Sequence, residues 1–240
     1  MILKICGITN QPDATAAIDA GATALGFNFY KRSPRYIEPD RAGEIATAAG
    51  VRRVGVFVNE EPERVEEIAR VARLDVAQLH GNETPAPYSV TGGATVSLPA
   101  AQLSPGRAAG RTSRIGSRQH RTGIPVLYPQ HVPVWKALPV RAEFNISLYD
   151  ELPVEALLLD SPGSGVEYGG LGRTFDWSLV QASKRNIVLA GGLNASNVAL
   201  AVARVKPWGV DACSLIESAP GKKDHKKMAE FLHAAMLAAL

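Results

Sequence analysis

The sequence predicts a single (β/α)8 barrel domain over residues 1–240. Short apolar runs typical of buried strands occur eight times along the chain, and most of them are followed by a segment with helical periodicity. A length of 240 residues is ample for one large hydrophobic core. A doubly wound open sheet is the alternative, but such a sheet usually has fewer strands than eight.

The first part of the chain alternates strands and helices regularly. Ile2, Leu3 and Ile5 form a short apolar run that ends at Cys6, and we expect a buried strand there. Further strands are expected at 24–29, 53–58 and 76–80, and helices at 11–20, 40–49 and 62–74. Glycines after the first two helical segments are typical helix stops.

The last part of the chain returns to the same alternation. Strands are expected at 132–138, 156–160, 187–190 and 209–214, and helices at 176–183, at 197–205 and from 224 onward. The final segment is amphipathic, which favours a helix docked on the barrel over a membrane helix.

Residues 91–130 interrupt the pattern. This stretch is rich in Arg, Gly and Pro, contains five arginines and no acidic residue, and has little helical periodicity. We expect an irregular basic insertion that replaces or distorts the fourth helix, because its composition favours a poorly packed segment. A basic lid or a nucleic-acid patch is the alternative; the composition favours it less.

Composition excludes several classes of protein. The chain is 46% hydrophobic and 20% charged, with a net charge of +3, so overall charge indicates no particular partner. Its two cysteines, Cys6 and Cys213, lie in apolar runs, which argues against a disulfide scaffold and for a reducing cytoplasm. We expect no signal peptide and no membrane span, because no apolar run approaches about 18 residues.

In a barrel, the chemistry takes place where the carboxyl ends of the strands meet. The side chains to consider there are Cys6, Asn28, Asn59, His80, Lys136, Asp160, Gly191, Gly192 and Ser214. Cys6 and Asp160 come from the first and sixth strands, and together they suit proton transfer between a base and an acid. The alternatives are a small buried cysteine and a carboxylate that caps a loop.

Other strand-end residues suggest the kind of substrate. Gly191, Gly192 and Ser214 follow the last two strands, where barrels often bind phosphate. The loop after the sixth strand offers Gly170 and Gly172 in the same way. Arg35 presents a planar fork of donors that suits a carboxylate. His80 ends the fourth strand without a set of residues at metal spacing, so we expect a hydrogen-bonded histidine and no metal site. No nucleotide-binding loop is recognised.

A series of short motifs then identifies a family. They are Lys4-Ile-Cys-Gly-Ile8, Gly26-Phe-Asn-Phe29, Ser33-Pro-Arg-Tyr36, Gly55-Val-Phe-Val-Asn59, Gln78-Leu-His-Gly-Asn-Glu83, Leu157-Leu-Leu-Asp160, Phe175-Asp-Trp177, Leu189-Ala-Gly-Gly-Leu-Asn194 and Pro220-Gly-Lys-Lys-Asp224. In this set and order, over about residues 1–88 and 132–240, the chain resembles the phosphoribosylanthranilate isomerases of tryptophan biosynthesis.

The resemblance implies a TIM barrel that catalyses a cofactor-free Amadori rearrangement of a phosphosugar, as a cytoplasmic monomer or homodimer. By the family's pattern, Asp160 is the general acid and Cys6 the general base. Arg35 holds the carboxylate of the anthranilate, His80 is a candidate substrate contact, and the phosphate is surrounded by glycines and a serine. Those phosphate residues are Gly170, Gly172, Gly191, Gly192 and Ser214.

Three departures from the family's pattern leave alternatives open. One is the stretch 91–130, which does not resemble the family's fourth helix. Leu171 stands where the family usually has threonine, and Leu215 stands where it usually has glycine. Leucine adds bulk beside the expected phosphate site and resists positive φ. A phosphosugar-binding barrel with impaired catalysis is therefore one alternative. Another phosphosugar isomerase on the same fold is a second alternative. Such an isomerase uses two aspartates, so the cysteine at the end of the first strand disfavours it.

Overall fold

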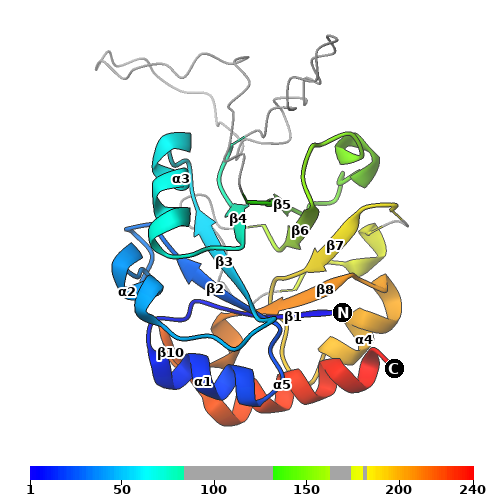
Figure 1. The fold of residues 1–240 in the computed structure, drawn as a ribbon. Coiled ribbons are helices and arrows are strands. Elements are labelled where there is room, and N and C mark those ends of the chain that lie inside the picture. The colour runs from blue at the N-terminus through cyan, green and yellow to red at the C-terminus, as the bar shows by residue number, and fades with distance from the viewer. Residues whose placement is uncertain (84–131, 163–173, 181–182) are drawn as a thin grey trace, which may run out of the picture.

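The computed structural model describes residues 1–83, 132–162, 174–180 and 183–240. Within them, eight parallel strands close into a barrel in chain order, with β8 returning to β1 (Figure 1). The strands are β1 Ile2–Cys6, β2 Ala24–Asn28, β3 Arg52–Phe57, β4 Val76–Leu79, β5 Val134–Pro139, β6 Ala156–Asp160, β7 Asn186–Leu189 and β8 Gly209–Ala212. The predicted (β/α)8 fold is confirmed.

Helices cover the outside of the barrel. In the described residues they are α1 Gln11–Asp19, α2 Pro39–Glu44, α3 Pro62–Val71, α4 Val198–Val205 and α5 His225–Ala238, with short 3-10 turns η2 Ile146–Tyr149, η3 Trp177–Leu179 and η4 Ser214–Ile216. The segment expected as a basic insertion, 91–130, lies outside the described residues.

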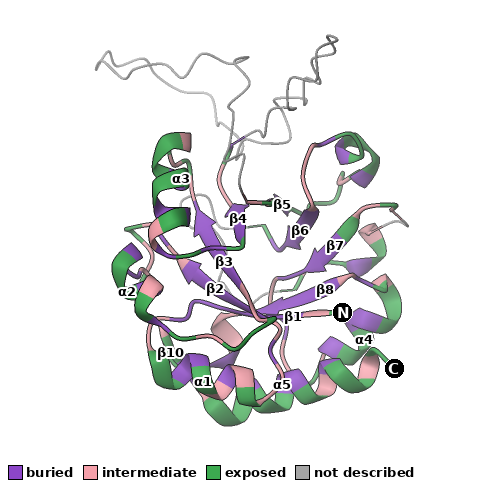
Figure 2. Cartoon of the chain, in the orientation of Figure 1, coloured by how far each residue is buried: buried purple, intermediate pink, exposed green. Residues whose placement is uncertain are grey.

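The strands are buried on both faces, which explains their nearly continuous apolar runs (Figure 2). Alternate residues such as Val54, Val76 and Leu158 form a small core inside the barrel. Their neighbours, such as Leu157, form a larger core that packs against the helices. Because side chains alternate along a strand, this choice of register also fixes which residues reach the interior of the barrel mouth.

The second helix is shorter than predicted. It was expected over 40–49, but α2 ends at Glu44, and Ile45 is already extended. The guanidinium of Arg53 donates to the carbonyls of Ala42 and Ile45, which a longer helix would have used for its own N–H groups. The side chain of Gln11 binds both the N–H and the carbonyl of Ala46. Tertiary hydrogen bonds therefore replace the last turns of the predicted helix.

The helix predicted over 176–183 is also wrong in extent. In the described part of this range, residues 176–180 and 183, the structure has only the 3-10 turn η3, and Val180 leaves it in an extended conformation with φ −86° and ψ 95°. Asp176 caps this turn by accepting the N–H of Ser178. A β-branched residue that prefers extended backbone ends the turn after three residues.

A short hairpin after β8 was not predicted. Strands β9 Glu217–Ala219 and β10 Lys222–Lys223 pair antiparallel, joined by Pro220 and Gly221. Gly221 has φ +79°, the conformation that a Pro-Gly turn requires of its glycine. The Pro-Gly pair was the available signal, but two very short strands carry almost no pattern of their own.

Candidate active site

A cavity of about 550 Å3 opens at the carboxyl ends of the strands. It is lined by side chains from strands far apart in the sequence, including Cys6, Asn28, Gln78, His80, Asp160, Asp211 and Cys213, and by the loops that follow them, including Arg35, Gly191, Gly192, Ser214 and Leu215. The structure therefore brings Cys6 and Asp160 to one cavity, as the strand-end prediction required.

Cys6 lies in a cationic and hydrogen-bonding environment. Lys4, two residues earlier on the same face of β1, is fully buried and donates to Asp211 Oδ2 at 2.9 Å. A hydrogen bond from the Cys213 thiol and the charges of Lys4 and Lys223 favour the thiolate, and they outweigh burial, so the pKa of Cys6 lies well below its ordinary value. The same hydrogen bond, together with burial, raises the pKa of Cys213. Cys6 is thus the thiol of this pair that ionises first.

The carboxyl of Asp160 is held from two sides. Its Oδ1 accepts the backbone N–H of Ser161 at 2.7 Å, and its Oδ2 lies 3.3 Å from His80 Nε2. Gln78 Nε2 donates to Nδ1 of His80 at 3.0 Å, so Nε2 carries the proton of a neutral imidazole and donates toward Asp160. His80 therefore lies in the cavity as a hydrogen-bonded histidine that orients a carboxyl.

Of the two glycines after β7, Gly191 approaches Asp160 closely. Gly191 and Gly192 have φ +79° and +62°. A Cβ on Gly191 would lie 2.7 Å from the backbone nitrogen of Ser161 and 2.8 Å from Asp160 Oδ1. Leu215 lines the same cavity from η4 but does not adopt a positive φ, so a leucine fits the backbone there. Gly170 and Gly172 lie outside the described residues.

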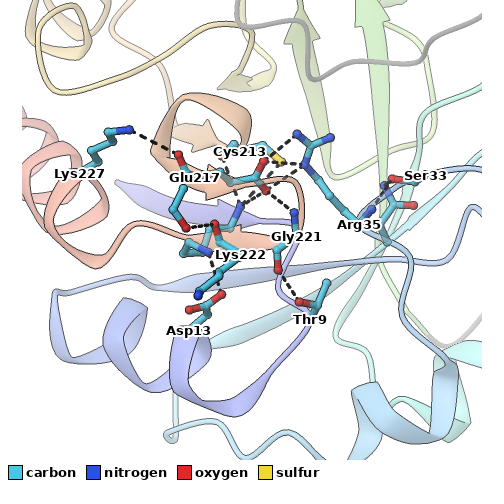
Figure 3. A network of polar contacts seen from close by, with 12 residues as sticks. Thr9, Asp13, Ser33, Arg35, Cys213, Glu217, Gly221, Lys222 and Lys227 are labelled. Atoms are coloured by element: carbon cyan, nitrogen blue, oxygen red, sulfur yellow. Dashed lines mark hydrogen bonds and ion pairs between the residues drawn. The ribbon is translucent and has the colours of Figure 1, made fainter.

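Arg35 reaches the cavity from the loop after β2, and a buried acid holds it there. Glu217 of the hairpin accepts Nε of Arg35 at 2.9 Å on Oε1 and at 3.1 Å on Oε2, and it accepts Nη2 at 2.7 Å on Oε2 (Figure 3). Lys223 Nζ donates to Oε1 of the same carboxylate at 2.9 Å. No described residue binds Nη1 of Arg35, which leaves this donor for a ligand. Sequence reasoning did not identify Glu217 or Lys223, because the hairpin that carries them was missed.

Two of the strand-end residues lie elsewhere. Lys136 Nζ donates to the carbonyl of Gly81 at 2.7 Å and lies 3.4 Å from Glu83 Oε2. The backbone N–H of Asn59 donates to the same Glu83 carboxyl. These residues form a separate cluster beside the fourth strand, and they do not line the cavity.

Among the described residues, no group of three or more His, Cys, Asp or Glu side chains is arranged to hold a metal ion. Likewise, none of the helices in the described ranges combines the length and the apolar character that crossing a membrane demands.

Comparisons with known proteins match nearly the whole chain. The family model described as N-(5'-phosphoribosyl)anthranilate (PRA) isomerase matches residues 3–104 and 118–234. The N-(5'-phosphoribosyl)anthranilate isomerase of Solibacter usitatus is 53% identical over 238 residues, which cover 99% of this chain and 98% of the relative.

Solved structures agree in fold and in family. The phosphoribosyl anthranilate isomerase of Thermus thermophilus is 31% identical, with a TM-score of 0.74 and 99% of each chain covered. A phosphoribosyl anthranilate isomerase in complex with reduced 1-(o-carboxyphenylamino)-1-deoxyribulose 5-phosphate is 34% identical, with a TM-score of 0.70 and with 98% of this chain and 99% of that one covered. With the closed barrel and the shared cavity of Cys6 and Asp160 already in place, these matches show that the chain belongs to the N-(5'-phosphoribosyl)anthranilate isomerase family.

Proposed function

We propose that this chain isomerises N-(5'-phosphoribosyl)anthranilate to 1-(o-carboxyphenylamino)-1-deoxyribulose 5-phosphate, with Cys6 as general base and Asp160 as general acid. The observation that carries the proposal is that both groups line one cavity of about 550 Å3. The relative solved with the reduced form of this product supports the choice of ligand.

In the first step, Asp160 donates its proton to the ring oxygen of the ribose, and the ring opens to an iminium at C1'. The hydrogen bonds from Ser161 and His80 hold the carboxyl in place for this transfer. In the second step, the thiolate of Cys6 takes the proton from C2', and the electron pair moves toward C1'. The resulting enolamine gains a proton at C1' and loses the proton of its C2' hydroxyl, which gives the neutral ketone.

The reaction needs only proton transfers, since C1' is reduced as C2' is oxidised within one molecule. No cofactor is therefore required. Cys6 suits the role of base because its lowered pKa favours the thiolate, the form that accepts a proton.

The two ends of the substrate are held by different parts of the mouth. Nη1 of Arg35 is directed to the anthranilate carboxylate, while Glu217 keeps the rest of the guanidinium fixed. Gly191, Gly192 and Ser214 line the same cavity, and their backbone N–H groups are proposed to bind the phosphate. Gly170 and Gly172 are proposed to complete this phosphate site.

The test follows the fluorescence of the anthranilate substrate. Cys6→Ser and Asp160→Asn should each lower turnover by about 100-fold to 10,000-fold, the usual contribution of a positioned acid or base. Asp176→Asn is the matched control, because that carboxylate caps η3 outside the cavity. If turnover persisted at the wild-type rate in both active-site variants, the assignment of the two roles would be overturned.

A phosphosugar-binding barrel with impaired catalysis is the second candidate, and Leu215 at the cavity is the observation that favours it. Leu215→Gly would then tighten the binding of a phosphate analogue and raise turnover. We expect little change in either quantity, because Leu215 already fits its turn without positive φ.

A further inference from the structure

We propose that Cys6 and Cys213 form a reversible disulfide across the mouth of the barrel when the protein meets a peroxide, which makes this pair a modification site. Strand register carries the first part of the argument. Strands β1 and β8 pair in parallel, with Lys4 opposite Asp211 and Ile5 opposite Ala212. Cys6 and Cys213 each come one residue after the last of these pairs.

The register also sets the direction of the two side chains. Lys4 and Asp211 meet inside the barrel, and Cys6 and Cys213 each come two residues later, so both thiols point to the same face. Neighbouring strands lie about 4.8 Å apart, which falls within the Cα separation of about 4.4–6.8 Å that disulfides span.

The positions of the two sulfur atoms agree with this. A Cβ on Gly7, the residue after Cys6, would lie 3.2 Å from the sulfur of Cys213. A Cβ on Gly26 would lie 2.8 Å from the sulfur of Cys6. Because Gly7 and Gly26 have no side chain, the two sulfur atoms have room beside them. Both thiols line the cavity, and therefore a small solute can reach them.

The surroundings make one thiol the nucleophile and the other its partner. Lys4 and Lys223 place positive charge near the pair, and the neighbouring Cys213 thiol favours ionisation of Cys6. Lys223 Nζ also donates to the carbonyl of Cys213 at 3.3 Å. A thiolate in a cationic pocket, with a second thiol in contact, is the arrangement that favours oxidation to a disulfide.

The chemistry balances with a peroxide as the oxidant. The Cys6 thiolate attacks one oxygen of hydrogen peroxide, an S–O bond forms, the O–O bond breaks and hydroxide leaves. Cys213 then attacks the sulfenic sulfur, the S–S bond forms and the S–O bond breaks. The sulfenic oxygen takes the proton of Cys213 and leaves as water. The hydroxide from the first step takes one further proton and also becomes water. A dithiol reductant returns both thiols by exchange.

Formation of the disulfide rests on the positions and charges around the two thiols, whereas its effect on turnover rests on the proposed role of Cys6 as the base. A sulfur held in a disulfide cannot accept the C2' proton. Oxidised protein should therefore turn over about 100-fold more slowly or worse, and dithiothreitol should restore the rate.

The experiment exposes the full chain to hydrogen peroxide, alkylates the remaining thiols, and maps peptides by mass spectrometry with and without dithiothreitol. We expect a linked peptide pair that contains Cys6 and Cys213, a mass lower by two hydrogens, and loss of both alkylation sites. Oxygen adducts on Cys6 with Cys213 still alkylated, or two intact thiols after exposure, would overturn the proposal.

Cys213→Ser is the matched variant, because it keeps a hydrogen-bond donor beside Cys6 but removes the second sulfur. Each protein is compared with its own rate before oxidation. In the variant, peroxide should drive Cys6 to sulfinic acid, and dithiothreitol should no longer restore turnover. Recovery equal to that of wild type would contradict the proposal.

The two proposals fail in different ways. A linked peptide with full turnover would leave the disulfide standing and remove Cys6 from its catalytic role. If Cys6→Ser lost turnover but oxidised wild type gave no linked peptide, the catalytic role of Cys6 would stand and the disulfide would be overturned.

Discussion

At the scale of single residues, Lys4 lies between two acids of different kinds. Its ammonium is fully buried and donates to Asp211, and its charge favours the thiolate of Cys6. Burial opposes the charged form of Lys4, but Asp211 and Cys6 outweigh it and raise the pKa of Lys4. Burial raises the pKa of Asp211 to about 7, in spite of the attraction of Lys4. The position of Lys4 therefore keeps the base ionised.

Replacing Lys4 by methionine should shift the pH dependence of catalysis. Cys6 acts as a base only when ionised, so kcat/KM rises with pH through the pKa of Cys6. Without the neighbouring charge this pKa rises, and the acid limb of the profile should move up by about 1–2 pH units. The measurement is kcat/KM across pH 5 to 9, with exposed Lys226→Met as the control.

The double variant with Lys4→Met and Asp211→Asn separates two causes. Removing Lys4 alone leaves a buried carboxylate without its partner, which is destabilising by about 3–5 kcal/mol. The double variant should recover unfolding free energy, but the acid limb of its kcat/KM profile should stay at the higher pH. A limb that returned fully to its wild-type position would show that the orphaned Asp211, rather than the missing charge of Lys4, had raised the pKa of Cys6.

Gly191 permits a different single-residue test, because its Cβ would collide with the Asp160 carboxyl. Gly191→Ala should displace this carboxyl and lower kcat by about tenfold or more. Gly50→Ala is the matched control, since Gly50 has a similar φ of +85° but open space around it. It should cost only about 1 kcal/mol in unfolding free energy and leave kcat unchanged. Equal kcat in the two variants would refute the collision.

How far the sequence predicted these residues depends on the range of their contacts. Cys6 and Asp160 were predicted because strand ends in a barrel converge on one face whatever the loops do. The partners of Lys4 and Arg35 were not predicted, because Asp211 and Glu217 lie 207 and 182 residues away. No local periodicity encodes such pairs; the closed barrel alone brings them together.

At the scale of elements, the hairpin of β9 and β10 binds residues that follow the first two strands of the chain. Thr9 donates to the carbonyl of Gly221 at 2.6 Å, and Asp13 accepts the N–H of Lys223 at 2.9 Å (Figure 3). Glu217 holds Arg35 from the same hairpin. The hairpin thus fixes Arg35 at the cavity, and its sequence pattern did not predict these contacts.

Glu217→Gln should destabilise the protein in a pH-dependent way. Burial opposes ionisation of Glu217, but Arg35 and Lys223 outweigh it and hold the pKa of Glu217 below its ordinary value. The stabilisation is present above the unfolded pKa of about 4.3 and is lost as pH falls through the lower folded pKa. We expect a loss of about 3 kcal/mol at pH 7 by urea denaturation, and a smaller loss at pH 3.5.

Glu44→Gln is the control for this prediction, because Glu44 also pairs with an arginine but at an exposed site. Its effect on the unfolding free energy should stay below about 0.5 kcal/mol at either pH. A pH-independent loss in Glu217→Gln would mean that the lost stabilisation is packing and not charge.

At the scale of the whole molecule, the two ends of the chain close the barrel together. Strand β1 pairs with β8, and the last helix α5 packs against both α1 and α4. The alternation of apolar strands and helices was enough to predict this closure. Helix ends were less predictable, as in α2, because side chains from elsewhere took the carbonyls that would have continued the helix.

Closure through α5 predicts a loss of stability that is separate from catalysis. Phe231 is fully buried between α5 and the barrel, whereas Leu237 on the same helix is 58% exposed. Phe231→Ala should lower the unfolding free energy by about 3–5 kcal/mol, because the cavity it leaves cannot fill. Leu237→Ala should change it by less than about 0.5 kcal/mol.

Both variants should retain wild-type kcat per folded molecule without denaturant, since neither side chain lines the active-site cavity. Loss of kcat in fully folded Phe231→Ala, judged by an unchanged circular dichroism spectrum, would show instead that the packing of α5 controls the geometry of the barrel mouth.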